Sequence, residues 1–176
     1  MPEPLPLQID RLPTPIGELL IVADAAGTLR GIDWTDHEAR LQALLERAYG
    51  KDGYRLEPRR DPGGLTRALG AYFAGDLAAI DALPVEAPGT AFQRSVWQEL
   101  RNIAVGATIS YAALACRIGK PNAVRAAGLA NGRNPVSIVV PCHRVIGADG
   151  SLTGYGGGLS RKQWLLQHEG AWPRPR

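Results

Sequence analysis

The residues best suited to chemistry are a thiol, an imidazole and a guanidinium that follow one another at Cys142, His143 and Arg144. They come after an apolar, largely β-branched run at residues 136–140, which predicts a buried strand. Pro141 is expected to end that strand, because proline cannot donate to a sheet ladder. A reactive side chain at the end of a rigid strand is held in place by the core behind it. The sequence therefore points to Cys142 as the centre of a site.

A thiol becomes a good nucleophile as the thiolate, which requires a cationic or hydrogen-bonding environment. His143, Arg144 and Glu169 are the candidates to supply one. Neighbours in an extended chain point to opposite sides, so Cys142 and His143 need a turn after Pro141, or a water molecule between them, to interact. Either arrangement predicts a relay in which Glu169 orients the imidazole of His143.

Short helices are expected to position these groups. A capping box at Thr90–Gln93 begins a helix with buried positions up to residue 103. Ser110 is expected to cap a helix over 111–118, and a tight turn leads to a second helix over 123–131, so the pair matches a helix-turn-helix. Ser160 is expected to cap a last helix over 161–168.

Two features of these helices are informative. The second helix of the pair holds small residues, Ala126, Ala127 and Gly128, beside a single Arg125. This pattern leaves two interpretations open, close approach of the helix to DNA or tight packing of two helices. Glu169 follows the last helix, where the helix dipole opposes a carboxylate, and its position therefore suggests a specific partner.

Residues 1–85 predict an α/β scaffold domain with a small antiparallel sheet and helices. Strands are expected over 17–24 and 29–34 and are predicted to pair as a hairpin, and apolar spacing predicts helices over 37–49 and 65–73. A further strand is expected over 79–83. A linker rich in proline and glycine then separates this domain from a mostly helical domain at 86–176.

Composition limits the class of protein. The chain has 176 residues, 45% of them hydrophobic and 21% charged, which is typical of a globular protein. No apolar run approaches the roughly 20 residues that span a bilayer, and the start of the chain lacks the features of a signal peptide, so a cytoplasmic location is expected. Two cysteines and three histidines without metal-ligand spacing predict no metal site.

Charge is distributed unevenly. Residues 1–85 hold 9 Lys and Arg against 13 Asp and Glu, a net charge of −4, whereas residues 86–176 hold 11 against 4, a net charge of +7. The basic part also carries Cys142. This asymmetry favours a polyanionic partner, with nucleic acid first, over random drift of surface charge.

The run Pro141-Cys142-His143-Arg144-Val145 resembles the active-site signature of the O(6)-alkylguanine-DNA alkyltransferases, also called methylated-DNA–protein-cysteine methyltransferases. Other blocks resemble the family in the same order, and the whole is similar to the bacterial constitutive single-function type. The blocks are Phe92-Gln93 with Val96-Trp97, Ile109-Ser110-Tyr111, Val124-Arg125-Ala126, Asn134-Pro135, Thr153-Gly154-Tyr155 and Arg161-Lys162 to His168-Glu169-Gly170, with looser matches at Thr14-Pro15-Ile16-Gly17 and Tyr72-Phe73-Ala74-Gly75.

The resemblance implies direct transfer of an alkyl group from guanine to Cys142, with His143 and Glu169 as the rest of the relay. It also implies that Tyr111 and Lys162 help the guanine leave, and that a ribonuclease-H-like domain precedes the helix-turn-helix domain. The product is a thioether, which offers water no activated carbonyl. One turnover per molecule is therefore expected, without a cofactor, by a protein that is monomeric in solution.

The resemblance further implies flipping of the nucleotide out of duplex DNA that contains alkylated guanine, with O(4)-alkylthymine as a possible second substrate. Arg125 would fill the gap in the duplex, while Ala126, Ala127 and Gly128 would lie in the minor groove. Asn134 would be a hinge between the recognition helix and the active-site strand. Backbone groups near Cys142 and at Val145, Tyr155 and Gly156, together with Tyr111, would bind the base.

The sequence departs from the family in two respects. Two cysteines leave no zinc site of the kind that some members have in the N-terminal domain, and Gly156 stands where many members carry serine. Two other classes of protein fit these residues less well. A lesion-binding relative without transfer activity would lack Cys142, and a thiol hydrolase or redox protein is disfavoured because no second cysteine lies near it and no acyl-enzyme signature is visible.

Overall fold

The chain folds into two compact units in the computed structural model, which describes residues 2–172. The N-terminal unit comprises the chain up to Pro88 together with Pro135–Ser137. The C-terminal unit comprises Gly89–Asn134 and the chain from Ile138 onward. The segment that leads to Cys142 therefore belongs partly to each unit.

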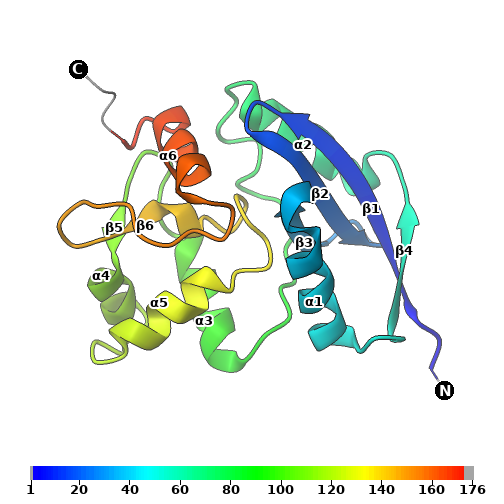
Figure 1. The fold of residues 1–176 in the computed structure, drawn as a ribbon, viewed down its shortest axis with the longest axis horizontal. Coiled ribbons are helices and arrows are strands. Elements are labelled where there is room, and N and C mark those ends of the chain that lie inside the picture. Colours follow the sequence, from blue (N-terminus) through cyan, green and yellow to red (C-terminus); the bar gives the residue numbers. More distant parts are fainter. Residues whose placement is uncertain (1, 173–176) are drawn as a thin grey trace. The chain divides into compact units, whose positions relative to one another are not determined.

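A four-stranded sheet forms the centre of the N-terminal unit (Figure 1). Its strands are β1 (Leu5–Thr14), β2 (Gly17–Asp24), β3 (Leu29–Trp34) and β4 (Tyr54–Pro58), in the order β3-β2-β1-β4. The predicted β2–β3 hairpin is confirmed. The sheet is mixed rather than wholly antiparallel, because β4 pairs in parallel with β1. The sequence did not predict β1 as a strand, because it contains prolines.

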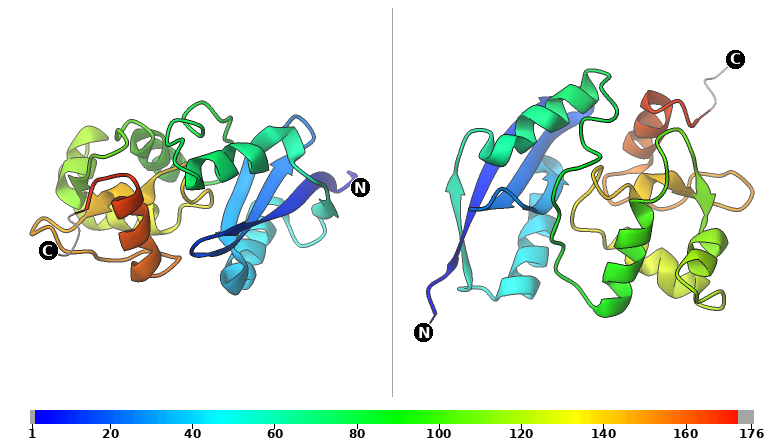
Figure 2. Two further views of the ribbon diagram at one scale, coloured as in Figure 1. Left: turned by 90° about the horizontal axis from the view of Figure 1, so that it is seen from above. Right: turned by 180° about the vertical axis from the view of Figure 1, so that it is seen from behind.

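Two helices cover the opposite faces of this sheet (Figure 2). After the 3₁₀ turn η1 (Thr35–His37), α1 (Glu38–Tyr49) buries Leu41 and Leu45 against Leu7, Leu20 and Val22. After η2 (Pro62–Gly64), α2 (Leu65–Phe73) packs near Leu12, whose side chain lies on the other face. Both helices were expected.

The outer edge of β3 is covered by two later segments. Leu29 N donates to Pro84 O at 2.9 Å, and Ile32 N donates to Pro135 O at 2.9 Å. The predicted strand over 79–83 is wrong, since those residues form turns, and Val85 instead makes a single bridge to Leu29. These contacts satisfy backbone groups that an open sheet edge would leave unpaired.

The C-terminal unit is mostly helical. Its elements are α3 (Ala91–Leu100), β5 (Ile109–Ser110), α4 (Tyr111–Arg117), α5 (Val124–Gly132), the 3₁₀ turn η3 (Cys142–Arg144), β6 (Val145–Ile146) and α6 (Leu159–His168). The capping box of Thr90 and the cap of Ser110 are confirmed. The cap predicted for Ser160 is wrong, because α6 begins earlier and Gly158 occupies its N-cap position.

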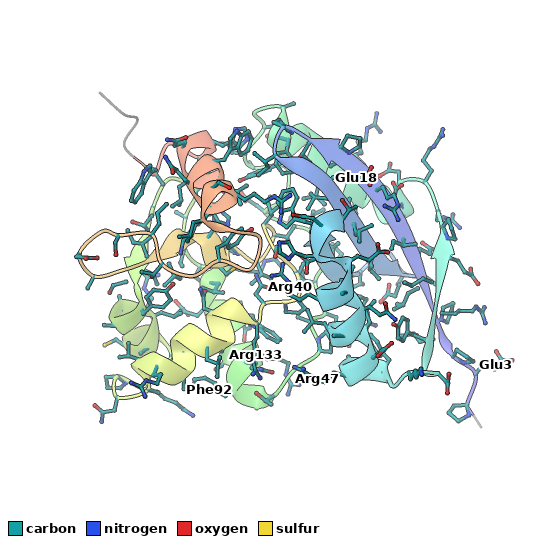
Figure 3. The ribbon with its side chains drawn as sticks, in the orientation of Figure 1. Glu3, Glu18, Arg40, Arg47, Phe92 and Arg133 are labelled. Atoms are coloured by element: carbon teal, nitrogen blue, oxygen red, sulfur yellow. The ribbon has the colours of Figure 1, made fainter. Side chains whose placement is uncertain are left out.

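Packing between α3 and the helix-turn-helix fixes the second helix of the pair. The Nε1 of Trp97 donates to Ala130 O at 2.8 Å, which ties α3 to α5. Lys120 lies in the turn between α4 and α5. Its ammonium is 5.3 Å from the ring centroid of Phe92, which is at the start of α3 (Figure 3).

None of the helices in the described residues has the length and apolar character needed to cross a membrane.

The segment before Cys142 is buried as predicted, but it is not a strand. Val136 makes only an isolated bridge to Ile32, and residues 138–139 form a turn. Ile138 has a φ of 76°, which is incompatible with a continuous strand. The apolar composition signalled burial, whereas the turn depends on tertiary contacts that a local pattern does not contain.

Candidate active site

Cys142 is the first residue of η3 and its relative exposure is only 6%. Cys142 N donates to Val140 O at 2.8 Å, and Arg144 N donates to Pro141 O at 3.0 Å. The chain thus turns directly after Pro141, which is one of the two arrangements expected from the sequence. This turn removes the alternation of an extended chain and places Cys142 and His143 in the same tight element.

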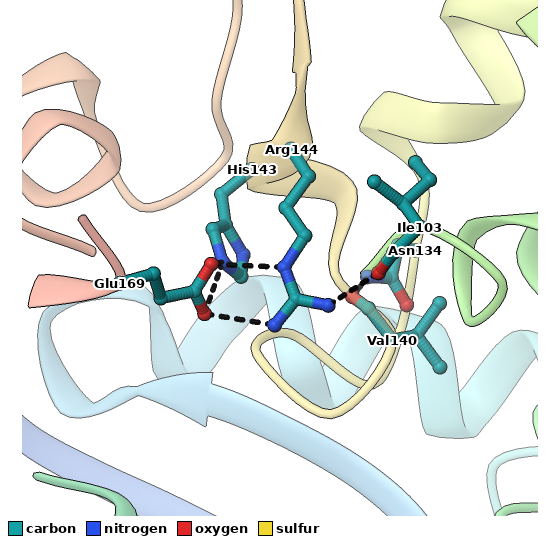
Figure 4. Close-up of polar contacts among 6 residues, drawn as sticks. All are labelled: Ile103, Asn134, Val140, His143, Arg144 and Glu169. Atoms are coloured by element: carbon teal, nitrogen blue, oxygen red, sulfur yellow. Dashed lines mark hydrogen bonds and ion pairs between the residues drawn. The ribbon is translucent and has the colours of Figure 1, made fainter. Parts of the chain in front are cut away.

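His143 and Glu169 form the buried part of the site (Figure 4). Nε2 of His143 lies 3.0 Å from each carboxylate oxygen of Glu169. A carboxylate only accepts, so the contact assigns the hydrogen to Nε2 and leaves the lone pair of a neutral ring on Nδ1. In the described residues Nδ1 has no hydrogen-bond partner.

Arg144 binds the same carboxylate. Its Nε donates to Oε1 of Glu169 at 2.8 Å and its Nη2 donates to Oε2 at 2.9 Å, while Nη1 donates to Ile103 O at 2.7 Å (Figure 4). The guanidinium is thus held at both ends in a bidentate arrangement. Sequence reasoning named Arg144 only as a cation near the thiol. The signal that a partner existed was the unfavourable position of Glu169 after α6.

These contacts set the charges of the site. Burial alone would raise the pKa of Glu169, but His143 and Arg144 outweigh it and hold that pKa far below its ordinary value of 4.5. Burial lowers the pKa of His143 below its ordinary 6.5, and the nearby carboxylate opposes this only in part. The resting site therefore contains a carboxylate, a guanidinium and a neutral imidazole.

Lys162 and Tyr111 form a second group. The fully buried Nζ of Lys162 donates to the carbonyls of Val145, Thr153 and Gly154 at 2.7, 2.8 and 3.3 Å. Tyr111 donates its hydroxyl to the same Thr153 carbonyl at 3.0 Å. Burial lowers the pKa of Lys162 to about 8, although the nearby Cys142 opposes the shift. Together the two side chains hold the loop between β6 and α6.

The start of α4 places Tyr111. Parallel pairing of β5 with β6 joins Ile109 to Val145, directly after η3, and Tyr111 follows β5 in the chain. On the other side, a Cβ at Gly128 would lie 3.4 Å from Cδ1 of Tyr111. That distance is ordinary van der Waals contact, so Gly128, which the resemblance places against DNA, lies directly beside the tyrosine ring.

Two asparagines link the end of α5 to the segment around Cys142. Asn134, predicted as a hinge, donates Nδ2 to Val140 O at 2.7 Å. Asn131 donates Nδ2 to Cys142 O at 3.4 Å and is only 3% exposed. Sequence reasoning missed Asn131, although a buried asparagine requires polar partners.

The other predicted residues divide by exposure. Arg125 and Ala126 are exposed on α5, whereas Ala127 is fully buried and packs into the unit, so it offers no surface to a partner. Tyr155 and Gly156 are partly buried in the loop before α6. Within residues 2–172, no group of three or more His, Cys, Asp or Glu side chains is arranged to hold a metal ion.

A buried cysteine and a paired histidine in a unit with a helix-turn-helix, after an α/β unit, define a two-domain DNA-binding protein with a nucleophilic thiol. Family models agree with this class. Residues 11–87 match the ribonuclease-like domain and residues 91–171 the DNA-binding domain of 6-O-methylguanine DNA methyltransferase. The chain belongs to this family, which confirms the resemblance and the predicted fold class.

Relatives in several organisms support the assignment. The methylated-DNA–protein-cysteine methyltransferase of Salmonella typhimurium is 51% identical over 161 residues, which cover 92% of this chain and 94% of the relative. The enzyme of the same description from Mycolicibacterium paratuberculosis is 55% identical over 128 residues, which cover 72% and 76%. The crystal structure of Mycobacterium tuberculosis OGT in complex with DNA matches with a TM-score of 0.74 and 38% identity, covering 94% of this chain and 93% of that one.

Proposed function

We propose that this chain repairs duplex DNA by transferring the alkyl group of O(6)-alkylguanine to Sγ of Cys142, once per molecule. The observation that carries the proposal is the turn in which buried Cys142 precedes His143, whose Nε2 is bonded to ionised Glu169. This arrangement leaves Nδ1 as the only ring nitrogen with a lone pair for the thiol proton.

In the proposed reaction, His143 accepts the proton of the thiol at Nδ1, directly or through a water molecule. The sulfur then forms a bond to the alkyl carbon as the bond from that carbon to O6 breaks, and the electron pair passes to the guanine. Tyr111 gives the departing base a proton and regains one from solvent. Glu169 stabilises the imidazolium, and the ammonium of Lys162 favours the thiolate.

The domain at 86–176 would supply both DNA binding and transfer, with residues 1–85 as the scaffold. The target carbon is inside the duplex, so the nucleotide must leave the stack. Arg125, exposed on α5, would occupy the resulting gap, and Ala126 would lie close to the backbone of the DNA. Asn134 would couple α5 to the Cys142 segment, and backbone groups at Val145, Tyr155 and Gly156 would bind the base.

Incubation with duplex that contains O(6)-methylguanine, followed by intact mass and peptide mapping, tests the proposal. One added methyl group on the peptide of Cys142 is expected, with loss of the lesion from the DNA. Cys142→Ser should bind the duplex without becoming modified. An unmodified wild-type protein beside unrepaired DNA, or methylation at Cys116, would contradict the proposed acceptor. The cytoplasmic location and the monomeric state stay predictions.

A further inference from the structure

Ile138 lies four residues before Cys142 and has an unusual backbone conformation. Its φ is 76°, in the left-handed region, and its side chain is fully buried. Among the described residues the only other non-glycine with positive φ is Asp61, a residue type that tolerates this region. A branched side chain such as that of isoleucine is a genuine outlier there, because Cβ crowds the following carbonyl.

Contacts on both sides of Ile138 keep the chain in this conformation. Before it, Pro135 O accepts from Ile32 N and Val136 bridges to the same residue of β3. After it, Val140 O accepts both from Nδ2 of Asn134 at 2.7 Å and from Cys142 N at 2.8 Å. The bond from Asn134 closes a loop around Ile138. A strained residue persists only where its surroundings determine the conformation in this way.

Glycine would make the same turn without steric cost, because it adopts positive φ freely. It would also allow many other conformations at that point of the chain. Isoleucine restricts them, since its buried side chain anchors the turn in the core. Val139 and Val140, which follow, are 5% and 2% exposed and extend the same buried anchor to Pro141.

From this geometry, and building on the proposed role of Cys142 as acceptor, we infer that Ile138 is a positioning residue for alkyl transfer. Its left-handed backbone and buried side chain fix the path of Val139–Pro141, and thereby the start of η3 and the location of the Cys142 sulfur relative to His143 and Lys162. Displacement of a reacting group by about 1 Å is enough to slow a reaction on the order of a hundredfold. The strained backbone at Ile138 therefore lies where the position of the Cys142 sulfur affects the rate of transfer.

A pair of variants separates this role from simple packing. Ile138→Ala and Ile138→Gly both remove the buried side chain, but only glycine relieves the left-handed backbone. We expect Ile138→Gly to melt higher than Ile138→Ala by roughly 1–3 °C, and yet to transfer the methyl group on the order of tenfold more slowly at saturating DNA. Affinity for unmodified duplex should be equal in the two variants. Ala43→Gly, on the exposed face of α1, is the control. It should lose the stability that glycine usually costs in a helix, and its rate of transfer should not change.

The reaction of Cys142 with a small thiol reagent gives a second measure. Ile138→Gly should change the pH at which Cys142 reacts at half its maximal rate relative to Ile138→Ala, because a displaced sulfur lies at other distances from Lys162 and from the linked group of His143, Glu169 and Arg144. The exposed Cys116 in the same molecule is the internal control. This measurement does not require alkylated DNA. If wild-type protein takes no methyl group, the proposed function fails, and the reagent still tests Ile138.

Two results would overturn the inference: transfer by Ile138→Gly as fast as by Ile138→Ala, or a glycine variant that is the less stable of the two. If neither variant folds, Ile138→Val decides, because it keeps the branch at Cβ and most of the buried volume. Retention of most of the transfer rate supports the inference. A tenfold loss at unchanged duplex affinity contradicts it.

Discussion

Arg144 holds Glu169 through two hydrogen bonds, from Nε at 2.8 Å and Nη2 at 2.9 Å, on the carboxylate that also accepts from His143. Both partners are only 5% exposed. The guanidinium supplies the charge that keeps the carboxylate ionised, and the carboxylate in turn fixes the ring of His143. A buried ion pair of this kind matters most when one partner is removed, because the other is left as an uncompensated charge.

Replacement of Arg144 by alanine is expected to lower the free energy of unfolding by about 3–5 kcal/mol. Arg144→Lys keeps the charge but loses the bidentate geometry, so its loss should be smaller but clear. Arg11→Ala is the matched control, since the Arg11–Glu18 pair is exposed and should contribute within about 1 kcal/mol. Urea unfolding at pH 7 measures all three. Equal losses of unfolding free energy for Arg144→Ala and Arg11→Ala would contradict a larger contribution from the buried pair.

The lowered pKa of His143 predicts how transfer responds to acid. The neutral ring is the base, and a pKa below 6.5 means that it stays neutral as the pH falls through that value. The single-turnover rate at saturating DNA should therefore stay nearly constant from pH 7 to below pH 6.5 and decrease only at lower pH. If the rate instead falls to half its maximum at pH 6.5 or above, the carboxylate of Glu169 has a larger effect than burial on the pKa of His143.

The same shift affects stability with a definite sign. Below pH 6.5 an unfolded chain takes a proton on His143 that the folded chain resists, so the unfolded state binds more protons and stability falls with falling pH. Glu169 adds to this below its ordinary pKa of 4.5, since its folded pKa is depressed. Unfolding measured from pH 7 to pH 4, below the titration of Lys162, should show the loss begin with His143 and steepen with Glu169.

Local patterns in the sequence were sufficient for most elements of the C-terminal unit. The capping box at Thr90 and the cap at Ser110 are formed by residues three apart in the chain, so both could be predicted. The strand β1 and the turn at Ile138 could not. β1 contains prolines that local rules exclude, and Ile138 is held in a rare conformation by contacts with distant parts of the chain.

The residues of the site also fall into those that the sequence predicted and those that it did not. Cys142 stood out because its neighbours are chemically unusual, and Glu169 because a carboxylate after a helix is unfavourable there. Asn131 and the bidentate role of Arg144 were missed, since each depends on a partner from another element. The small residues of α5 left DNA contact and helix packing open, and the resemblance implied DNA contact for Ala127, whose complete burial places it in the core instead.

Lys162 gives a test in the alkaline range. Its folded pKa of about 8 lies below the ordinary 10.5, so between these values the unfolded chain holds a proton that the folded chain has released. Stability should therefore rise from pH 8 to pH 10.5, by up to roughly 3 kcal/mol from this group. Lys162→Met lacks the group, and the difference between the two unfolding curves isolates its contribution. Parallel curves would contradict a buried, shifted lysine.

Arg125 and Arg133 provide the sharpest test of DNA recognition. Both are exposed, one on α5 and one just after it (Figure 3 labels Arg133), so alanine at either should change stability by less than about 0.5 kcal/mol. Each also removes one positive charge, which weakens general attraction to DNA equally. If Arg125 fills the gap left by a flipped nucleotide, Arg125→Ala should slow repair of duplex on the order of tenfold or more, and Arg133→Ala far less. Transfer from the free base O(6)-benzylguanine should be nearly the same in both variants. Equal losses on duplex and free base for Arg125→Ala would instead indicate damage to the transfer site.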